Sequence, residues 1–214
     1  MATQTTPFQG TKFYIGTGTE QEKAITAVSL KLATVTVTGH GFKAGDCIKL
    51  TGLGELDGFY PVKSIASDVI TLADEVNWAD RDQPDLKGAK VAKVKWSANF
   101  GAVRNLERSE DTISEEDITT MGDEGTVTKA GEIEFGSTKL TFFKDSSSAI
   151  QQLLREKFFA KETFPFLLIF KKNLGSIYGT GFIQSLNNYS GETKGKFEAG
   201  ATIKHSKRDY YLSA

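Results

Sequence analysis

The segment KFEAGATIK, residues 196–204, carries the strictest strand pattern in the chain. Apolar residues occupy every second position from Phe197 through Ala199 and Ala201 to Ile203, and polar residues or glycine lie between them. A period of two is typical of a β-strand with one buried face, because successive side chains point to opposite faces of a sheet. The charged and hydroxyl side chains of the other face belong to Lys196, Glu198, Thr202 and Lys204.

The segments before this strand indicate more β-structure and one helix. FPFLLIF, residues 164–170, is apolar on both faces and predicts a strand between two layers. Residues 176–186 predict the next strand. A helix is expected over residues 147–159, because Ile150, Leu153, Leu154 and Phe158 recur at helical spacing. Ser148 and Gln151 have the spacing of a capping box at its start.

Two further β-regions lie nearer the N-terminus. Residues 132–143 predict a long strand with a bulge or bend at Gly136–Ser137, where the alternation changes phase. Between residues 24 and 72, short strand patterns are separated by glycine-rich turns, which suggests a small barrel or sandwich. The polar segment 77–88 reads as a linker back to the main body.

An acidic segment interrupts the strands between Arg104 and Gly125. It has few apolar residues and no steady period of two or 3.6, so we predict a long solvated loop. Loops of this length inside a compact domain are usually functional or disordered. Its eight carboxylates are Glu107, Glu110, Asp111, Glu115, Glu116, Asp117, Asp123 and Glu124.

Composition excludes several kinds of protein. The net charge of −1 over 214 residues does not indicate a surface that binds nucleic acid or membranes. No apolar run approaches the ~20 residues of a membrane span. The first ten residues lack the layout of a signal peptide, so we expect a protein made in a cytoplasm. With one cysteine and two histidines, a Cys-rich zinc site is impossible. We read His40 as a turn residue, His205 as a strand-end residue and Cys47 as a small core residue, and we predict no catalytic site, no metal and no cofactor.

The order of several blocks resembles the tail tube, or major tail, proteins of long-tailed bacteriophages. The matching blocks are GTKFYI at 10–15, the acidic segment before the strand at 131–135, the helix SSSAIQQLL, FPFLLIF, GTGFIQSL at 179–186 and FEAGATI at 197–203. The last two blocks are the most specific. The resemblance covers about residues 1–22 and 89–214, and it implies a discontinuous tail tube domain.

A second resemblance concerns residues 25–72, which look like the small β-barrel in the first catalytic-cysteine half-domain of ubiquitin-activating enzymes. It rests on VTVTGHGFKAGD at 35–46, ELDGFYPV at 55–62 and VITL at 69–72. Gly39, Gly41 and Gly45 are expected to supply positive φ at its turns. The resemblance implies a small all-β barrel inserted at residues 23–88 and no enzymatic role. Together the two resemblances imply a mainly β (α+β) fold: a tail-tube β-sandwich or partial barrel flanked by one helix, plus the inserted barrel.

The tail tube resemblance also implies a function. Proteins of that family form hexameric rings that stack into a tube, so the expected partners are further copies of the chain and the tail's initiator, tip and terminator proteins. Double-stranded DNA would pass through without specific binding, and the location would be the virion tail. The acidic segment would be an assembly loop between rings. Either this loop or the polar face of Lys196, Glu198, Thr202 and Lys204 would line the channel.

Two other functions stay open from the residues alone. Tyr60, Trp78, Trp96 and Tyr189, if exposed on one face, would suit a carbohydrate-binding or cell-surface-binding module. The acidic segment could instead bind Ca²⁺, although it lacks the spaced acidic pattern of an EF-hand loop.

Overall fold

The computed structural model describes residues 7–121, 124–191, 193 and 195–213. In this part of the chain the protein is mostly β-structure with one α-helix. It forms two compact units, the first from residues 1–101, 164–180 and 209–214, and the second from residues 102–163 and 181–208. The chain therefore passes between the units four times, and neither unit is one continuous segment. The division into a tail tube domain and an insertion at 23–88 stays a prediction.

The first unit is built on one antiparallel sheet with the strand order β3-β4-β7-β6-β5-β8-β1-β13. Short strand β2 pairs with β8, and β16 pairs with the first residues of β14. Its elements are β1 (Lys12–Thr19), β2 (Lys23–Ala24), β3 (Ala27–Ser29), β4 (Thr34–Thr36), β5 (Cys47–Thr51), η1 (Gly54–Leu56), β6 (Gly58–Ala66), β7 (Val69–Leu72), β8 (Lys90–Trp96), β13 (Phe164–Ile169), η2 (Lys171–Asn173) and β16 (Tyr210–Leu212).

Apolar side chains of these strands form an extensive core. Ile48, Leu50, Val62, Ile70 and Val91 are fully buried within it. The expectation for FPFLLIF is confirmed, because the first four residues of β13 are buried in succession and so on both faces. The glycines at positions 39, 41 and 45 have φ of 61°, 71° and 85°, so each of these turns uses the left-handed region as predicted.

The second unit contains a four-stranded antiparallel sheet in the order β14-β15-β12-β9. Its elements are β9 (Val103–Arg108), β10 (Thr112–Asp117), β11 (Thr128–Glu134), β12 (Ser137–Phe143), α1 (Ala149–Ala160), β15 (Glu198–His205) and the later part of β14 (Ser176–Ser190). Ala199, Ala201 and Ile203 are buried as expected. Phe197, expected on the same face, is 62% exposed because it lies one residue before β15 begins.

Helix α1 confirms the expected apolar face but not the expected cap. Leu154 is fully buried, and the helix starts after Ser148, whose side chain makes no cap hydrogen bond. Gln151 is used differently: its Nε2 donates to the Phe143 carbonyl at 2.7 Å, and its Oε1 accepts from the Asp145 N–H at 3.1 Å. The capping-box prediction was therefore wrong, because this glutamine ties the helix to the end of β12.

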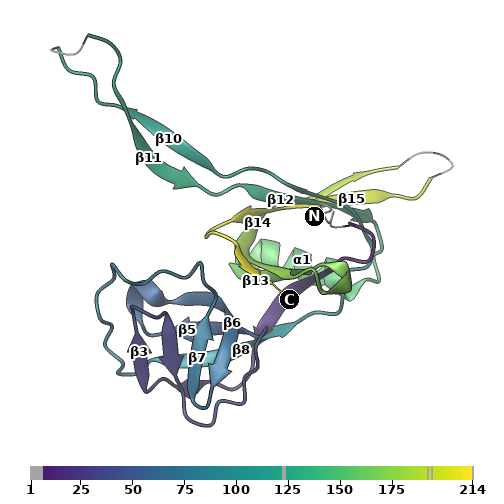
Figure 1. Ribbon diagram of the computed structural model, residues 1–214. Coiled ribbons are helices and arrows are strands. Elements are labelled where there is room, and N and C mark those ends of the chain that lie inside the picture. The colour runs from purple at the N-terminus through teal and green to yellow at the C-terminus, as the bar shows by residue number, and fades with distance from the viewer. Residues whose placement is uncertain (1–6, 122–123, 192, 194, 214) are drawn as a thin grey trace, which may run out of the picture. The chain divides into compact units, whose positions relative to one another are not determined.

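The prediction of an irregular loop at 104–125 was also wrong. Residues 103–108 form β9, which pairs with β12, and β10 pairs with β11 in a two-stranded antiparallel sheet (Figure 1). All six residues of β10 are exposed. Hydrophobic periodicity records burial on one face, so a hairpin with both faces exposed gives no such signal. The break expected at Gly136 is confirmed, because it separates β11 from β12.

Candidate functional site: an acidic arm and a basic pocket

Segment 110–134, which we call the acidic arm, forms a projecting hairpin in its described residues, 110–121 and 124–134 (Figure 1). Within it, Ile113 faces Ile133, and Glu116 faces Lys129 across the ladder. The register shifts between Ile113 and Glu115, which marks a bulge. Each of the two facing isoleucines is 58% exposed, although isoleucine is among the residues most often buried in proteins. The arm thus offers an apolar surface that its own chain does not cover.

The base of the arm is fixed by a compact set of hydrogen bonds. One Asp111 carboxylate oxygen accepts from the Gly136 N–H and from Arg108 Nη2, each at 2.7 Å. The pKa of Asp111 is lowered, mainly by the hydrogen bond from Gly136. Burial opposes this effect, and the hydrogen bond and charge of Arg108 lower the pKa further. Ser109 and Ser137 add two bonds, from the Ser109 N–H to the Ser137 carbonyl and from the Ser137 N–H to the Ser109 hydroxyl. These bonds set the direction in which the arm leaves the sheet.

Near the tip, Asp117 and Thr119 close the ladder. The Thr119 hydroxyl and N–H both donate to Asp117 Oδ1, at 2.5 and 2.9 Å, and they lower the pKa of this carboxyl. The Val127 N–H donates to the Thr119 hydroxyl at 2.9 Å, and the Ile118 N–H donates to the Val127 carbonyl at 3.0 Å. Asp117 is therefore engaged within the arm, whereas Glu115 and Glu116 have exposed carboxylates on β10.

Charge is strongly segregated within the second unit. The acidic arm contains nine acidic residues and one lysine, a net charge of −8. The rest of that unit contains twelve lysines and arginines and six acidic residues, a net charge of +6. A net charge of −1 for the whole chain conceals this separation.

The structure describes seven of the eight predicted carboxylates, and they lie in four places. Glu107 lies on β9 opposite Lys139 of β12, and it accepts a hydrogen bond from the Asn105 side chain at 2.7 Å. Glu110 and Asp111 lie at the base of the arm, whereas Glu115, Glu116 and Asp117 lie on β10 and Glu124 lies beside the tip. Asp123 is outside the described residues.

The predicted polar face of residues 196–204 is present, but its residues divide into two groups. Thr202 lies between Lys139 of β12 and Ser185 of β14, and Lys204 lies in the next position of the same face. Glu198 is at the start of β15, and Lys196 precedes the strand. These last two belong to a pocket at the end of the sheet.

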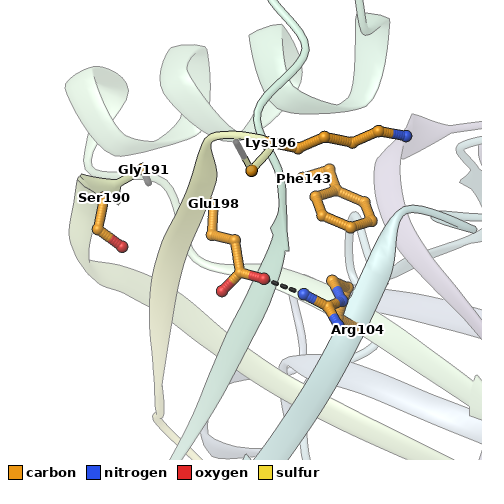
Figure 2. Close-up of a pocket in the computed structure, with 7 residues that line it drawn as sticks. Arg104, Phe143, Ser190, Gly191, Lys196 and Glu198 are labelled. Carbon is orange, nitrogen blue, oxygen red and sulfur yellow. Dashed lines mark hydrogen bonds and ion pairs between the residues drawn. The ribbon is translucent and has the colours of Figure 1, made fainter. Parts of the chain in front are cut away.

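This pocket, which we call the basic pocket, has a volume of about 410 Å³ (Figure 2). Figure 2 shows the Phe143 ring between the side chains of Arg104 and Lys196. The Arg104 guanidinium carbon is 4.7 Å from the ring centre, and Lys196 Nζ is 5.2 Å from it. Arg104 also forms an ion pair with Glu198. Ser190, Gly191 and Gly195 complete the lining.

Sequence reasoning did not find the basic pocket. Arg104 is on β9, Phe143 ends β12 and Lys196 precedes β15, so they lie far apart in the chain and share no motif. The β9-β12-β15 ladder brings them together by pairing Phe143 with Glu198 and Phe142 with Val103. Two residues of the pocket, Lys196 and Glu198, were predicted only as part of the polar face of the strand at 196–204.

The aromatic residues do not form the row that a sugar-binding face would need. Tyr60 and Trp78 are buried against each other, with ring centres 5.4 Å apart at an interplanar angle of 89°. Trp96 is partly buried, and only Tyr189 is largely exposed among the four. These four residues therefore do not form the exposed face that the carbohydrate-binding alternative requires.

The groups considered for chemistry lie mainly in cores. Cys47 is buried as expected, and burial raises the pKa of its thiol, with a further rise from the charge of Asp46. His40 is buried in its turn, where Nδ1 accepts from the Phe42 N–H at 2.9 Å and Nε2 lies 3.1 Å from the Ser67 carbonyl. Within the described ranges, no group of three or more metal-ligating side chains comes together. None of the described helices has the length and apolar character to cross a bilayer.

Comparison with protein-family models gives no match, and comparison with curated proteins gives none either. Solved structures do show similarity. A chain from the virion of a native gene transfer agent (GTA) particle has a TM-score of 0.43 and 16% identity, covering 55% of this chain and 89% of that one. A chain from the tail of an empty GTA particle with C6 symmetry also has a TM-score of 0.43 and 16% identity, covering 56% and 87%.

A chain of the SPP1 tail tube has a TM-score of 0.41 and 14% identity, covering 66% of this chain and 74% of that one. These three comparisons give no support to the resemblance of residues 25–72 to the barrel of ubiquitin-activating enzymes.

Proposed function

We propose that this chain is a structural tail tube protein, which self-assembles into stacked hexameric rings around a channel for DNA. The observation that carries the proposal is the acidic arm: a formed hairpin in which no residue of β10 or β11 is buried by the described part of the chain. An isolated two-stranded hairpin is marginally stable in water, and stability usually needs a third strand or another packing partner. A neighbouring copy would supply that partner. The order of sequence blocks from residue 131 to residue 203 supports the same family.

Strand β9 supports assembly independently of the arm. It is the last strand of its sheet, with β12 as its only strand neighbour among the described residues. An edge strand offers backbone donors and acceptors to another chain, and closing sheets edge to edge around a ring removes such edges. Charged side chains on β9, namely Arg104, Glu107 and Arg108, would oppose uncontrolled pairing before assembly.

The proposed channel must pass DNA without holding it. DNA carries one negative charge per ~1.7 Å of helix axis, so an acidic wall repels it. The acidic arm provides that character with its net charge of −8. The half-exposed face of β15 is mixed instead, because it carries Glu198, Thr202 and Lys204. Of the two candidate linings, we therefore favour the arm.

In this proposal the inserted segment 23–88 lies on the outer wall of the tube, and the assembled protein is part of a virion tail built in the host cytoplasm. Tail initiator, tip and terminator proteins would be its further partners. No catalytic step is part of this function.

Electron microscopy of the purified chain tests the proposal. At high protein concentration, negative staining should show rings or tubes, and analytical ultracentrifugation at low concentration should show a monomer. The triple variant Glu115→Lys, Glu116→Lys and Asp117→Lys should remain a folded monomer and form few tubes. Tubes of unchanged abundance from this variant would remove the arm from assembly, and an absence of rings or tubes from the unmodified chain would contradict the function.

A further inference from the structure

The basic pocket and the acidic arm lie at opposite ends of the same sheet. The arm continues from the Arg108 end of β9 and the Ser137 end of β12, whereas the pocket is formed at Arg104 and Phe143, where these strands have their other ends. The seven residues of β12 separate the two ends by about 20 Å. In Figure 1 the arm and the paired strands β14 and β15 extend to opposite sides. The arm of a copy therefore points away from its own pocket.

The pocket has more positive charge than its own residues neutralise. Two cations flank a single aromatic ring, where the π-face attracts them both. Glu198 pairs with Arg104. Among the described residues, no carboxylate forms an ion pair with Lys196, and the described charged residues of the lining, Arg104, Lys196 and Glu198, sum to a net charge of +1. Arginine and lysine on an aromatic surface are suited to bind carboxylates.

We propose that the basic pocket receives carboxylates of the acidic arm from a second copy of this chain, with Lys196 as the main contact and Glu115 or Glu116 as the ligand. This inference rests on the proposed function and adds to it the site at which the arm binds. The charges of −8 on the arm and +6 on the rest of its unit make such contacts attractive along the whole approach. Glu115 and Glu116 are chosen because Asp117 is already hydrogen-bonded to Thr119.

The geometry also fixes the kind of assembly. A contact between one end of a copy and the opposite end of the next is heterologous, and it repeats in one direction. Each copy offers one arm and one pocket, so a docked pair still has one free arm and one free pocket with which to add further copies. Such a series closes into a ring where the rotation between copies allows it, and otherwise continues as an open stack.

A chemical cross-link tests the contact directly on the unmodified protein. Carbodiimide joins a lysine amine to a carboxylate only when the two groups are in contact. In assembled tubes, mass spectrometry should detect a Lys196 peptide joined to the peptide containing Glu115 and Glu116, and mixing isotopically light and heavy protein should show that the link joins two copies. Arm peptides joined only to lysines of other surfaces would overturn the proposed site.

Charge reversal tests its contribution. Lys196→Glu should raise the protein concentration needed for tubes about tenfold, as expected from loss of one close charge pair. Lys31→Glu, the same charge change at an exposed turn of the first unit, is the matched control and should have little effect. Adding Glu115→Lys and Glu116→Lys to Lys196→Glu should restore much of the assembly that either change alone removes.

The outcomes separate the two proposals. If the unmodified chain forms tubes and Lys196→Glu assembles as well as Lys31→Glu, the pocket is not the binding site while the tube function stands. If the unmodified chain forms no tubes at any concentration, both proposals fail. Far-ultraviolet circular dichroism of each monomer confirms that a lost tube is not a lost fold.

Discussion

Two β-hairpins of this chain differ in almost every respect that determines stability. The hairpin of β5 and β6 contributes Ile48, Leu50 and Val62, each fully buried, to the core of the first unit. The hairpin of β10 and β11 buries none of the residues that the structure describes in it. The first hairpin is packed against other parts of its own chain, whereas the second leaves its surface exposed and accessible to another chain. If the proposed function holds, folding and assembly depend on separate parts of the sequence.

Removing the arm should have the largest effect, and it should fall on assembly alone. Replacing residues 112–134 by a short Gly-Ser linker between Asp111 and Phe135 should abolish tubes in electron micrographs. The melting temperature of the monomer should change by less than about 2 °C, because no core residue is lost. A large fall in melting temperature would show that the arm stabilises the fold of the monomer, and would contradict this prediction.

Truncating one apolar side chain in each hairpin sharpens the same contrast. Leu50→Ala should lower the free energy of unfolding by about 2–5 kcal/mol, because it leaves a cavity in a closed core. Ile113→Ala should change it by less than about 0.5 kcal/mol, because that side chain is already largely in water. Urea denaturation of the two monomers measures both values. Similar losses of unfolding free energy in the two variants would contradict the contrast between a buried and an exposed hairpin.

Gly136→Ala tests the joint between arm and sheet. A Cβ at this position would meet Arg108 Nη1 and the Ser109 carbonyl oxygen, and would lie 2.6 Å from the Glu110 carbonyl oxygen. Backbone atoms cannot move aside as a flexible side chain can, so we expect a loss of about 1–3 kcal/mol in stability. Gly125→Ala, at a position with no atoms within 4 Å of the added carbon, is the control. Equal stability of the two variants would contradict a crowded joint.

The smallest effect concerns pH at the same joint. The pKa of Asp111 is lowered in the folded chain, so its stabilising bonds are fully present above the ordinary carboxyl pKa of about 4 and are lost as pH falls through the lowered value. The amide resonance of Gly136, which donates to Asp111, should therefore show a titration step with its midpoint below about pH 4. Asp111→Asn should remove that titration. A midpoint above pH 4 would contradict the hydrogen-bonding pattern described for the base.

The elements that could be predicted from the sequence are those whose burial produces a regular pattern of apolar residues. The strand predicted at residues 164–170 was identified because both faces are apolar, and the strand predicted at residues 196–204 because apolar and polar residues alternate. The two strands of the arm gave no hydrophobic periodicity, because their residues contact solvent on both faces. Gln151 has the spacing of a capping box relative to Ser148. In the structure its side chain instead forms hydrogen bonds with backbone groups of residues 143 and 145, which precede the helix.

Of the candidate site, the acidic residues were predictable from charge density alone, whereas their arrangement on a hairpin was not. The basic pocket depends on the register of β9, β12 and β15, and a one-residue slip in any pairing would turn Phe143 or Glu198 to the other face. Register is a tertiary property, so single-sequence reasoning had no access to it.

The single cysteine offers a practical advantage. Cys47 is 2% exposed and is the only cysteine of the sequence, so the native chain presents no accessible sulfur to maleimide reagents. Met121 lies at the opposite extreme, fully exposed near the arm tip. Met121→Cys would give one uniquely addressable position for a fluorophore, and its emission would report each docking event in real time while the core stays unlabelled.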